Sequence, residues 1–194
     1  MAGMAIGSTA QAAKFSIDAA HSSVGFKVRH LVAKTAGRFE RFSGTIDFVE
    51  GKPADWKVSA EIEVASINTD NSKRDEHLRG ADFFNAEKNP KMTFTSTRVS
   101  DVKGKKAKLH GNLTLNGVTK PVVLDMEMMG TGKDPWGNMK AGFTATTKIN
   151  RKDFGMNWNK TLDQGGVLLG EEIEIQIEIE AQQEAAAPAP AKAS

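Results

Sequence analysis

The chain has 194 residues, enough for one domain with a substantial core, and we find no internal linker that would divide it. Its 26 basic and 24 acidic residues are interspersed, a balance that gives no reason to expect a nucleic-acid partner. It contains no cysteine, and this excludes disulfides, thiolate zinc sites, iron–sulfur clusters and thiol nucleophiles.

The N-terminal stretch is small and apolar, and carries no charged side chain before Lys14. It contains Ala10-Gln11-Ala12, which has the form of a signal-peptide cleavage site. We therefore interpret residues 1–12 as the remnant of a secretory signal peptide, which predicts a periplasmic protein; the alternative is a flexible Ala/Gly/Ser leader. Residues 182–194 are rich in alanine and proline, and we expect this tail to be disordered.

Alternation of apolar and polar residues predicts β-strands along most of the chain. In the clearest early example, Val24, Phe26 and Val28 share one face with His30, so the apolar side of this strand ends in a histidine. Asn116-Gly117 is a strong signal for a two-residue hairpin. Further strands are predicted over residues 15–17, 39–48, 56–64, 92–96, 107–115, 122–128, 141–149 and 173–179.

Two interruptions occur in the first third of the chain. The alternation breaks at residues 31–36, where we expect a short turn or helix. The spacing of Phe39 and Phe42 shifts the parity as a β-bulge does, and Gly37 and Gly44 give the backbone freedom to bend. Bends of this kind are needed to close a sheet into a barrel.

We count about eight strands, since the short first segment at residues 15–17 adds little, and such a set with short connections fits either a sandwich or a closed barrel. Two observations favour the barrel. The strand count suits a barrel that holds one small ligand. The inward faces also mix bulky residues with glycine and alanine, which leaves room inside. We therefore predict that residues 13–181 form an all-β, eight-stranded antiparallel β-barrel.

Residues 67–94 depart from the strand pattern. They are polar first, then charged over residues 73–77, then aromatic at Phe83 and Phe84. Because a residue before proline is disfavoured in the helical region, we expect Asn89 to end a short helical excursion. This insertion is predicted to form a short helical cap over the mouth of the barrel.

A set of short motifs occurs in order between Lys14 and Glu180. They are Phe26-x-Val28-x-His30, Gly37-x-Phe39-x-x-Phe42-x-Gly44, Ile67-x-Thr69-x-Asn71-x-x-Arg74-Asp75-x-His77-Leu78, Asp82-Phe83-Phe84, Gly111-x-Leu113-Thr114-Leu115-x-Gly117-Val118-Thr119-Lys120-Pro121-Val122 and Arg151-x-Asp153-Phe154-Gly155. Together they make the chain similar to the YceI family. The resemblance implies a lipocalin-like barrel with a helical cap, export to the periplasm and a homodimer.

The resemblance also implies a function. Members of the YceI family carry long apolar ligands, which are polyisoprenoids, isoprenoid quinones or fatty amides, and they are linked to stress responses rather than to catalysis. Transient contact with a membrane would accompany such a role. Burial contributes about 0.8 kcal/mol per methylene, so a tail of about ten carbons would contribute roughly 8 kcal/mol before ordering and association costs.

The tail of such a ligand would lie in a cavity lined by inward-facing apolar residues. The alternative is that these side chains meet across the barrel and fill it. The residues that we expect to line the cavity are Phe26, Val28, Phe42, Phe48, Trp56, Ile62, Phe94, Leu113, Met126 and Phe143.

The head of the ligand would meet polar and aromatic residues at the mouth. Arg74 is expected to bind a phosphate or carbonyl group, with Asp75 and His77 orienting it. The alternative is that Arg74 and Asp75 form internal pairs that brace the cap, and that His30 is a hydrogen-bonded core residue. The complete expected set is His30, Arg74, Asp75, His77, Phe83 and Phe84.

No histidine pair has the spacing of a metal site, and no serine lies in a G-x-S-x-G motif. We therefore predict a binding protein without a metal or a cofactor other than its bound lipid. The alternative is an enzyme acting on a lipid-like substrate, with His77 and Asp75 as an acid–base pair.

Overall fold

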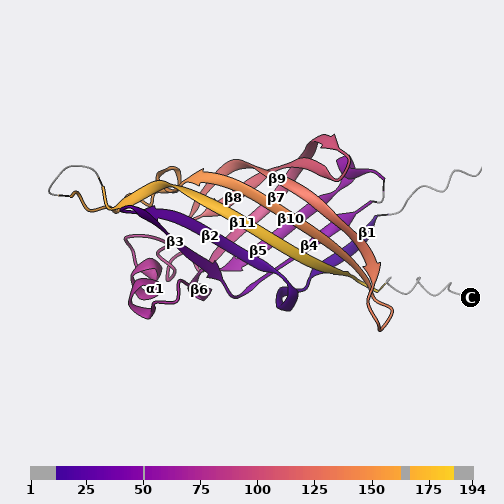
Figure 1. The fold of residues 1–194 in the computed structure, drawn as a ribbon, viewed down its shortest axis with the longest axis horizontal. Helices are drawn as coiled ribbons and strands as arrows, with labels where there is room; N and C mark the ends of the chain where they lie inside the picture. Colours follow the sequence, from indigo (N-terminus) through magenta and orange to yellow (C-terminus); the bar gives the residue numbers. More distant parts are fainter. Residues whose placement is uncertain (1–11, 50, 163–166, 186–194) are drawn as a thin grey trace, which may run out of the picture.

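The computed structural model describes residues 12–49, 51–162 and 167–185. It shows an elongated β-barrel with one short α-helix near one end (Figure 1). The strands are β1 (Ala13–Ile17), β2 (Ser23–His30), β3 (Ala33–Phe39), β4 (Phe42–Phe48), β5 (Lys57–Glu63), β6 (Ile67–Asn68), β7 (Lys91–Lys103), β8 (Lys106–Leu115), β9 (Val118–Lys133), β10 (Met139–Asn150) and β11 (Leu169–Gln183). The helices are α1 (Ser72–Arg79) and the 3-10 turns η1 (Ala19–His21), η2 (Pro53–Asp55), η3 (Val64–Ser66) and η4 (Arg151–Phe154).

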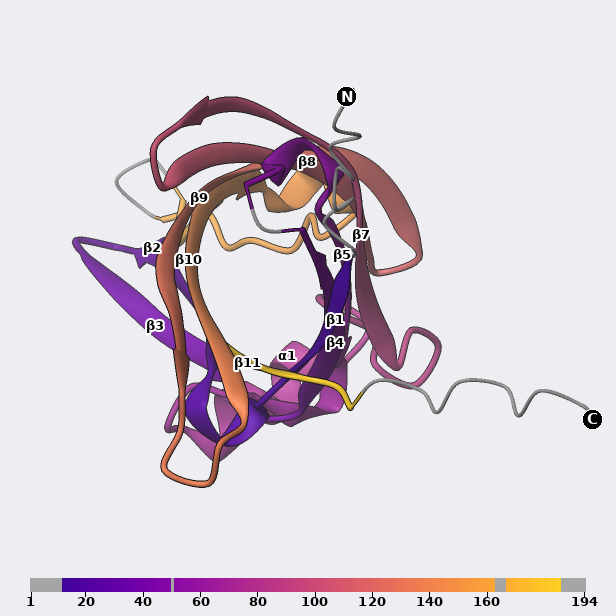
Figure 2. The same cartoon turned by 90° about the vertical axis from the view of Figure 1, so that its right-hand side faces the viewer.

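The 11 strand segments occupy eight positions around the barrel, because three positions are held by strands that are broken in the middle. β1 and β2 lie end to end along β11, β4 and β3 lie along them in turn, and β5 and β6 follow. Every pairing is antiparallel, and the pairing of β1 with β11 closes the ring, which Figure 2 shows end-on. The predicted all-β, eight-stranded antiparallel barrel is confirmed.

One of the breaks, between Phe39 and Phe42, is the bend that the sequence indicated. The first lies between β1 and β2, where Asp18 caps η1 and its backbone N–H donates to the Glu180 carbonyl at 2.8 Å. The second separates β3 from β4 between Phe39 and Phe42. At Gly44 a Cβ would lie 2.5 Å from the Ser59 carbonyl oxygen, so only glycine permits this close approach of β4 to β5.

Two local predictions need correction. Most of residues 31–36, expected to be a turn or helix, belongs to β3, and only Leu31 and Val32 form the loop. The small residues Thr35 and Gly37 hide the alternation there, since they take positions that large apolar residues occupy elsewhere. Gln182 and Gln183, assigned above to the tail, belong to β11; residues 1–11 and 186–194 lie outside the described part of the chain.

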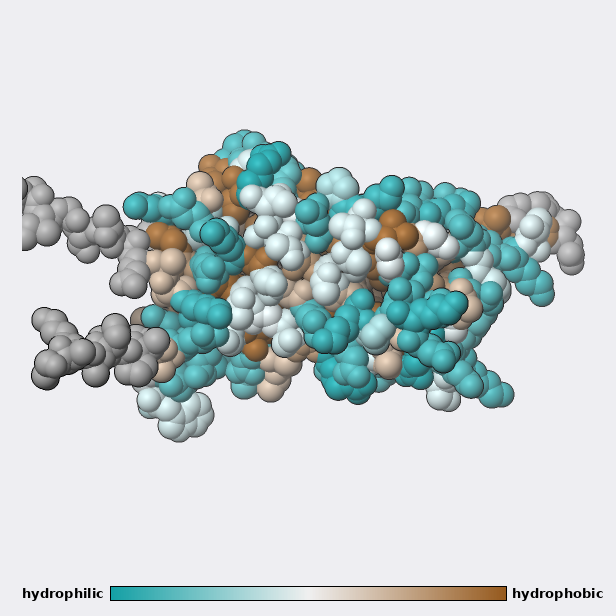
Figure 3. Space-filling view, turned by 180° about the vertical axis from the view of Figure 1, so that it is seen from behind, coloured by the Kyte–Doolittle hydropathy of each residue, from teal (hydrophilic) through white to brown (hydrophobic). Residues whose placement is uncertain are grey.

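The interior contains two groups of buried side chains. The closed-end cluster lies around the rings of Phe15, Phe48, Trp56 and Phe143, whose neighbouring centroids are 5.0–6.4 Å apart. The mouth-side cluster contains Val24, Phe39, Val64, Ile67, Met92, Leu113, Leu115, Phe154 and Met156. On the face that Figure 3 shows, hydrophilic side chains predominate and apolar side chains lie among them. Among the described residues, no helix is long and apolar enough to cross a membrane.

Candidate functional site: a cavity inside the barrel

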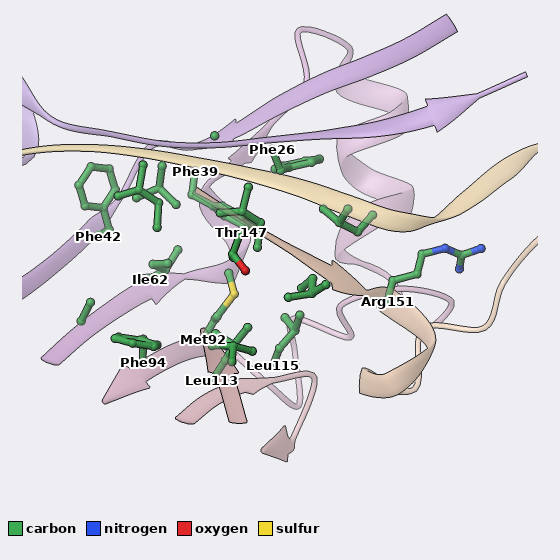
Figure 4. Close-up of a pocket in the computed structure, with 18 of the residues that line it drawn as sticks. Phe26, Phe39, Phe42, Ile62, Met92, Phe94, Leu113, Leu115, Thr147 and Arg151 are labelled. Atoms are coloured by element: carbon green, nitrogen blue, oxygen red, sulfur yellow. The ribbon is translucent and has the colours of Figure 1, made fainter. Parts of the chain in front are cut away.

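A cavity of about 490 Å³ lies inside the barrel, within the range of small-molecule sites. Its wall is almost entirely apolar. Figure 4 shows Phe42, Ile62 and Phe94 from different strands around this common space. Inward-facing residues such as Phe26, Phe42 and Ile62 stay only half-buried because nothing fills the space beside them. The interior is hollow, as the mixture of large and small inward residues predicted.

Nearly all the residues expected to contact a ligand tail are in the wall of this cavity. Phe48 is the exception and needs correction. Its ring packs against Phe15 and Trp56 at centroid distances of 5.8 and 5.0 Å, within the closed-end cluster. Alternation places Phe48 inside the barrel, but it is the last residue of β4 and lies beyond the cavity. The expected residues that do line it are Phe26, Val28, Phe42, Trp56, Ile62, Phe94, Leu113, Met126 and Phe143.

Strand β11 supplies part of the wall that the sequence analysis did not assign. Its inward-facing isoleucines are all lining residues. The signal was present, since this strand has the most regular alternation in the chain. These residues are Ile173, Ile175, Ile177 and Ile179.

Two glycines keep aromatic rings flat against the wall. A Cβ at Gly111 would lie 2.3 Å from the ring of Phe94, and a Cβ at Gly37 would lie 2.4 Å from the ring of Phe26. Each ring therefore occupies the place where a side chain on the neighbouring strand would stand. Because the rings lie along the wall instead of across the barrel, the space between opposite walls stays open.

The cap is fixed to the barrel through Thr69. The buried Asp75 carboxylate accepts hydrogen bonds from the Thr69 backbone N–H at 2.9 Å and from its hydroxyl at 2.5 Å. Arg74 donates through Nε to the Thr69 hydroxyl at 2.8 Å and through Nη2 to the Thr69 carbonyl at 2.7 Å. Of the two interpretations of this pair, the geometry supports bracing of the cap. Arg74 still lines the cavity, whereas Asp75 does not.

An aromatic cluster formed by His77, Phe83 and Trp158 lies at the mouth. The three ring centroids are 5.1–5.2 Å apart, and all three residues line the cavity. His77 Nε2 lies 2.9 Å from a carboxylate oxygen of Asp82, so the expected pairing of His77 with Asp75 is wrong. Trp158 was missed by the sequence analysis, although it follows the Arg-x-Asp-Phe-Gly motif by a few residues.

The other two expected head-group residues also reach the cavity. Phe84 lines it and packs edge-on against Phe39, with centroids 5.8 Å apart. His30 lines it from the exposed end of β2. The ionisable residues of the wall are His30, Lys73, Arg74, His77 and Arg151, and no carboxylate among the described residues lines the cavity.

Arg151 is the one arginine buried in the described part of the chain, at 2% exposure. It donates through Nε to the Gly170 carbonyl at 2.9 Å and through Nη1 to the Met156 carbonyl at 2.5 Å. Its Nη2 has no hydrogen-bond partner among the described residues, and burial lowers the pKa of the guanidinium. Arg151 thus joins η4 to the start of β11 beside the mouth.

A group of possible metal ligands lies at the break between β1 and β2. Ligand atoms of Asp18, His21 and Glu180 lie within 4.8 Å of one another. The ammonium group of Lys140 is 3.0 Å from Asp18 and 3.1 Å from Glu180, so a side-chain cation already balances these carboxylates. The arrangement is an ion-pair network that fastens the break.

Comparison with known proteins gives consistent matches. The YceI-like domain matches residues 15–181. A UPF0312 protein of Photorhabdus laumondii is 49% identical over 150 residues, covering 76% of this chain and 78% of the relative. Protein YceI of Salmonella arizonae is 44% identical over 169 residues, covering 86% and 85% of the two chains.

Solved structures have the same fold. The YCEI protein of Campylobacter jejuni is 39% identical, with a TM-score of 0.69, and the match covers 87% of this chain and 96% of that one. A polyisoprenoid binding domain from Saccharophagus degradans is 16% identical, with a TM-score of 0.63. The match covers 90% of this chain and 100% of that domain, and at this identity it shows the fold alone. On the extent of the domain match and of these identities, the chain belongs to the YceI-like domain family.

Proposed function

We propose that the protein binds a long-chain apolar ligand inside the barrel and carries or sequesters it. The observation that carries this proposal is an apolar cavity of about 490 Å³ whose ionisable groups gather at one end. The ligand class follows the family resemblance: a polyisoprenoid, an isoprenoid quinone or a fatty amide. The mechanism is exclusion of the tail from water, which contributes about 0.8 kcal/mol for each buried methylene.

The mouth favours a head group that accepts hydrogen bonds. Lys73, Arg74 and His77 are donors or potential donors, and no carboxylate among the described residues lines the wall to repel an anion or a carbonyl. Binding rather than turnover is proposed because His77 and Asp75, the candidate acid–base pair, have separate partners.

Mass spectrometry of the freshly purified protein under native conditions tests the proposal. We expect a species heavier than the polypeptide, and organic extraction should release the ligand for identification. A protein that appears only at the bare polypeptide mass, and that takes up neither ubiquinone nor a polyprenyl phosphate, would contradict the proposal.

A pair of variants on β7 makes the test specific to the cavity. Phe94→Glu places a charge in the apolar wall and should abolish loading, because no hydrocarbon can compensate the desolvated carboxylate. Thr95→Glu introduces the same charge at the next residue, which does not line the cavity and is exposed, and should load like the wild type. Circular dichroism must show that both variants are folded. Equal loading of both would overturn the assignment of the cavity.

We also propose that the protein acts in the periplasm, on the basis of the cleavage-site pattern at residues 10–12. Fractionation of the source cells, with detection of the natural protein by an antibody, is the test. Recovery of the protein with periplasmic markers is expected, and recovery only with cytoplasmic markers would contradict the proposal.

A further inference from the structure

The loop between β2 and β3 exposes apolar side chains at the end of a hairpin. His30 pairs with Ala33, so the loop consists of Leu31 and Val32. Val32 is 103% exposed and Leu31 is 41% exposed. Leu31 also has a φ of +53°, in the left-handed region, where a two-residue hairpin loop usually has glycine, asparagine or aspartate. The chain thus keeps two large apolar residues at a tip where polar or small residues would be less strained.

This tip adjoins the mouth of the cavity. The Leu31 N–H donates to the Leu168 carbonyl at 2.9 Å, and the neighbouring Val167 is 37% exposed. Leu168 and His30 line the cavity, so the tip and the wall are continuous. In Figure 1 the β2–β3 hairpin projects at the same end of the barrel as α1. We call Leu31, Val32 and Val167 the tip cluster.

Basic side chains surround the tip cluster. Arg29, Lys34 and Lys160 are all exposed, and Arg29 Nη1 donates to the Leu31 carbonyl at 3.1 Å. Lys34 has an ion-pair partner in Glu174 at 2.7 Å. Arg29 and Lys160 form no ion pair with another described residue, so no carboxylate of the described chain balances their positive charge beside the tip cluster. Exposed apolar residues with a basic border match the interface of a bilayer that contains anionic lipids.

We propose that the tip cluster inserts into the interface of an anionic phospholipid membrane, with Arg29 and Lys160 against the lipid head groups. This docking sets the mouth of the cavity against the bilayer, so that an apolar ligand enters or leaves without crossing water. The inference goes beyond the proposed binding function, because an empty barrel would dock in the same way.

Flotation with vesicles tests the docking. Vesicles of phosphatidylcholine with about a third phosphatidylglycerol are compared with vesicles of phosphatidylcholine alone, at low and high salt. We expect the wild type to float with the anionic vesicles, less so at high salt, and Val32→Asp to weaken this partition by about tenfold. The matched control is Val102→Asp: Val102 is 43% exposed and adjoins a lysine, but lies near the far end of β7, and the variant should bind like the wild type.

Three results of the flotation experiment would overturn the proposal. The tip cluster is not a membrane contact if the wild type floats with neither kind of vesicle, if Val32→Asp floats as well as the wild type, or if Val102→Asp loses binding equally. Sedimentation velocity tests whether a second copy of the chain, instead of a membrane, covers the tip cluster. If the wild type self-associates, Val32→Asp does not, and neither floats, the tip joins two copies of the chain and the proposal is wrong. Thermal melts must show that both variants are folded.

Discussion

The two ends of the barrel are built from the same strand pattern, yet one is filled and the other is hollow. At the closed end, the rings of Phe48 and Trp56 meet the ring of Phe143 across the interior, and all three are at most 8% exposed. Towards the mouth, Phe26 and Phe94 lie along the wall over glycines, and a cavity remains between them. Alternation determines which residues face inward, whereas the orientation of the rings decides whether they fill the barrel.

The comparison suggests a division of roles. The closed-end cluster contributes stability, because side chains such as Phe15 and Phe48 are buried in it and do not border the cavity. The hollow part gives up some of this stabilisation, since the atoms of its wall lack contacts on one side. What it leaves in return is an apolar cavity, the site of the proposed ligand.

The largest expected effect separates the two ends directly. Phe15→Ala removes a 2%-exposed ring from the filled end and should lower the free energy of unfolding by about 3–5 kcal/mol. Phe42→Ala removes a half-buried ring beside the existing cavity and should cost about 1–2 kcal/mol, mostly as lost apolar burial. Urea denaturation of both variants without ligand measures the difference. Equal losses would mean that the cavity is closed in solution.

The cap gives the next prediction. Asp75→Ala leaves the Thr69 N–H and hydroxyl without their acceptor in a buried place, and should lower the free energy of unfolding by about 2–3 kcal/mol. Asp82→Ala, which removes the exposed partner of His77, should cost less than about 0.5 kcal/mol. Hydrogen exchange at the Thr69 amide should accelerate only in the first variant. Unchanged protection there would show that Asp75 does not brace the cap.

Local patterns predicted the parts of the fold that depend on neighbours in sequence. The hairpin at Asn116-Gly117 has φ values of 51° and 73°, as a type I′ turn requires. The strand bend between Phe39 and Phe42 was likewise visible as a change of parity. Each follows from the chemistry of a few adjacent residues.

What depended on contacts across the barrel was not predictable in the same way. Phe48 shares the inward parity of Phe42, and only the assembled barrel shows that it packs beyond the cavity. At the mouth, proximity in sequence misled the assignment of Asp75 and His77. Residues two apart on a helix do not face each other, so Asp75 turns to Thr69 and His77 to Asp82.

The glycines under the rings offer a smaller and sharper test of the hollow part. Gly37→Ala should push the ring of Phe26 into the cavity and reduce ligand capacity, at a cost of about 1 kcal/mol in stability, because the contacts are with side-chain ends. Gly132→Ala, on β9, places a Cβ with no atom within 4 Å at a residue that does not line the cavity, and should bind ligand normally. Titration with a polyprenyl phosphate compares the two. Equal capacities would show that ring orientation does not set the size of the cavity.

The smallest expected effect concerns the break between β1 and β2, where the chain passes from the closed end to the mouth. Hydrogen bonds from His21 and Lys140 lower the pKa of Asp18 from 3.8 to about 2. Because the folded-state pKa is the lower one, the contribution to stability is complete above about pH 4 and is lost as the pH falls towards 2. The pairs are partly exposed, so this contribution should be about 0.5 kcal/mol.

Asp18→Asn should therefore be less stable than the wild type at pH 6, and the difference should disappear near pH 2, where the wild-type carboxylate is itself becoming protonated. Urea midpoints measured for both proteins between these pH values check this. A difference that stays constant down to pH 2 would show that the charge of Asp18 is not its source, since asparagine keeps a side-chain oxygen that can accept from the Ala20 N–H at the start of η1. The ion-pair network would then contribute nothing measurable to holding the two ends of the barrel together.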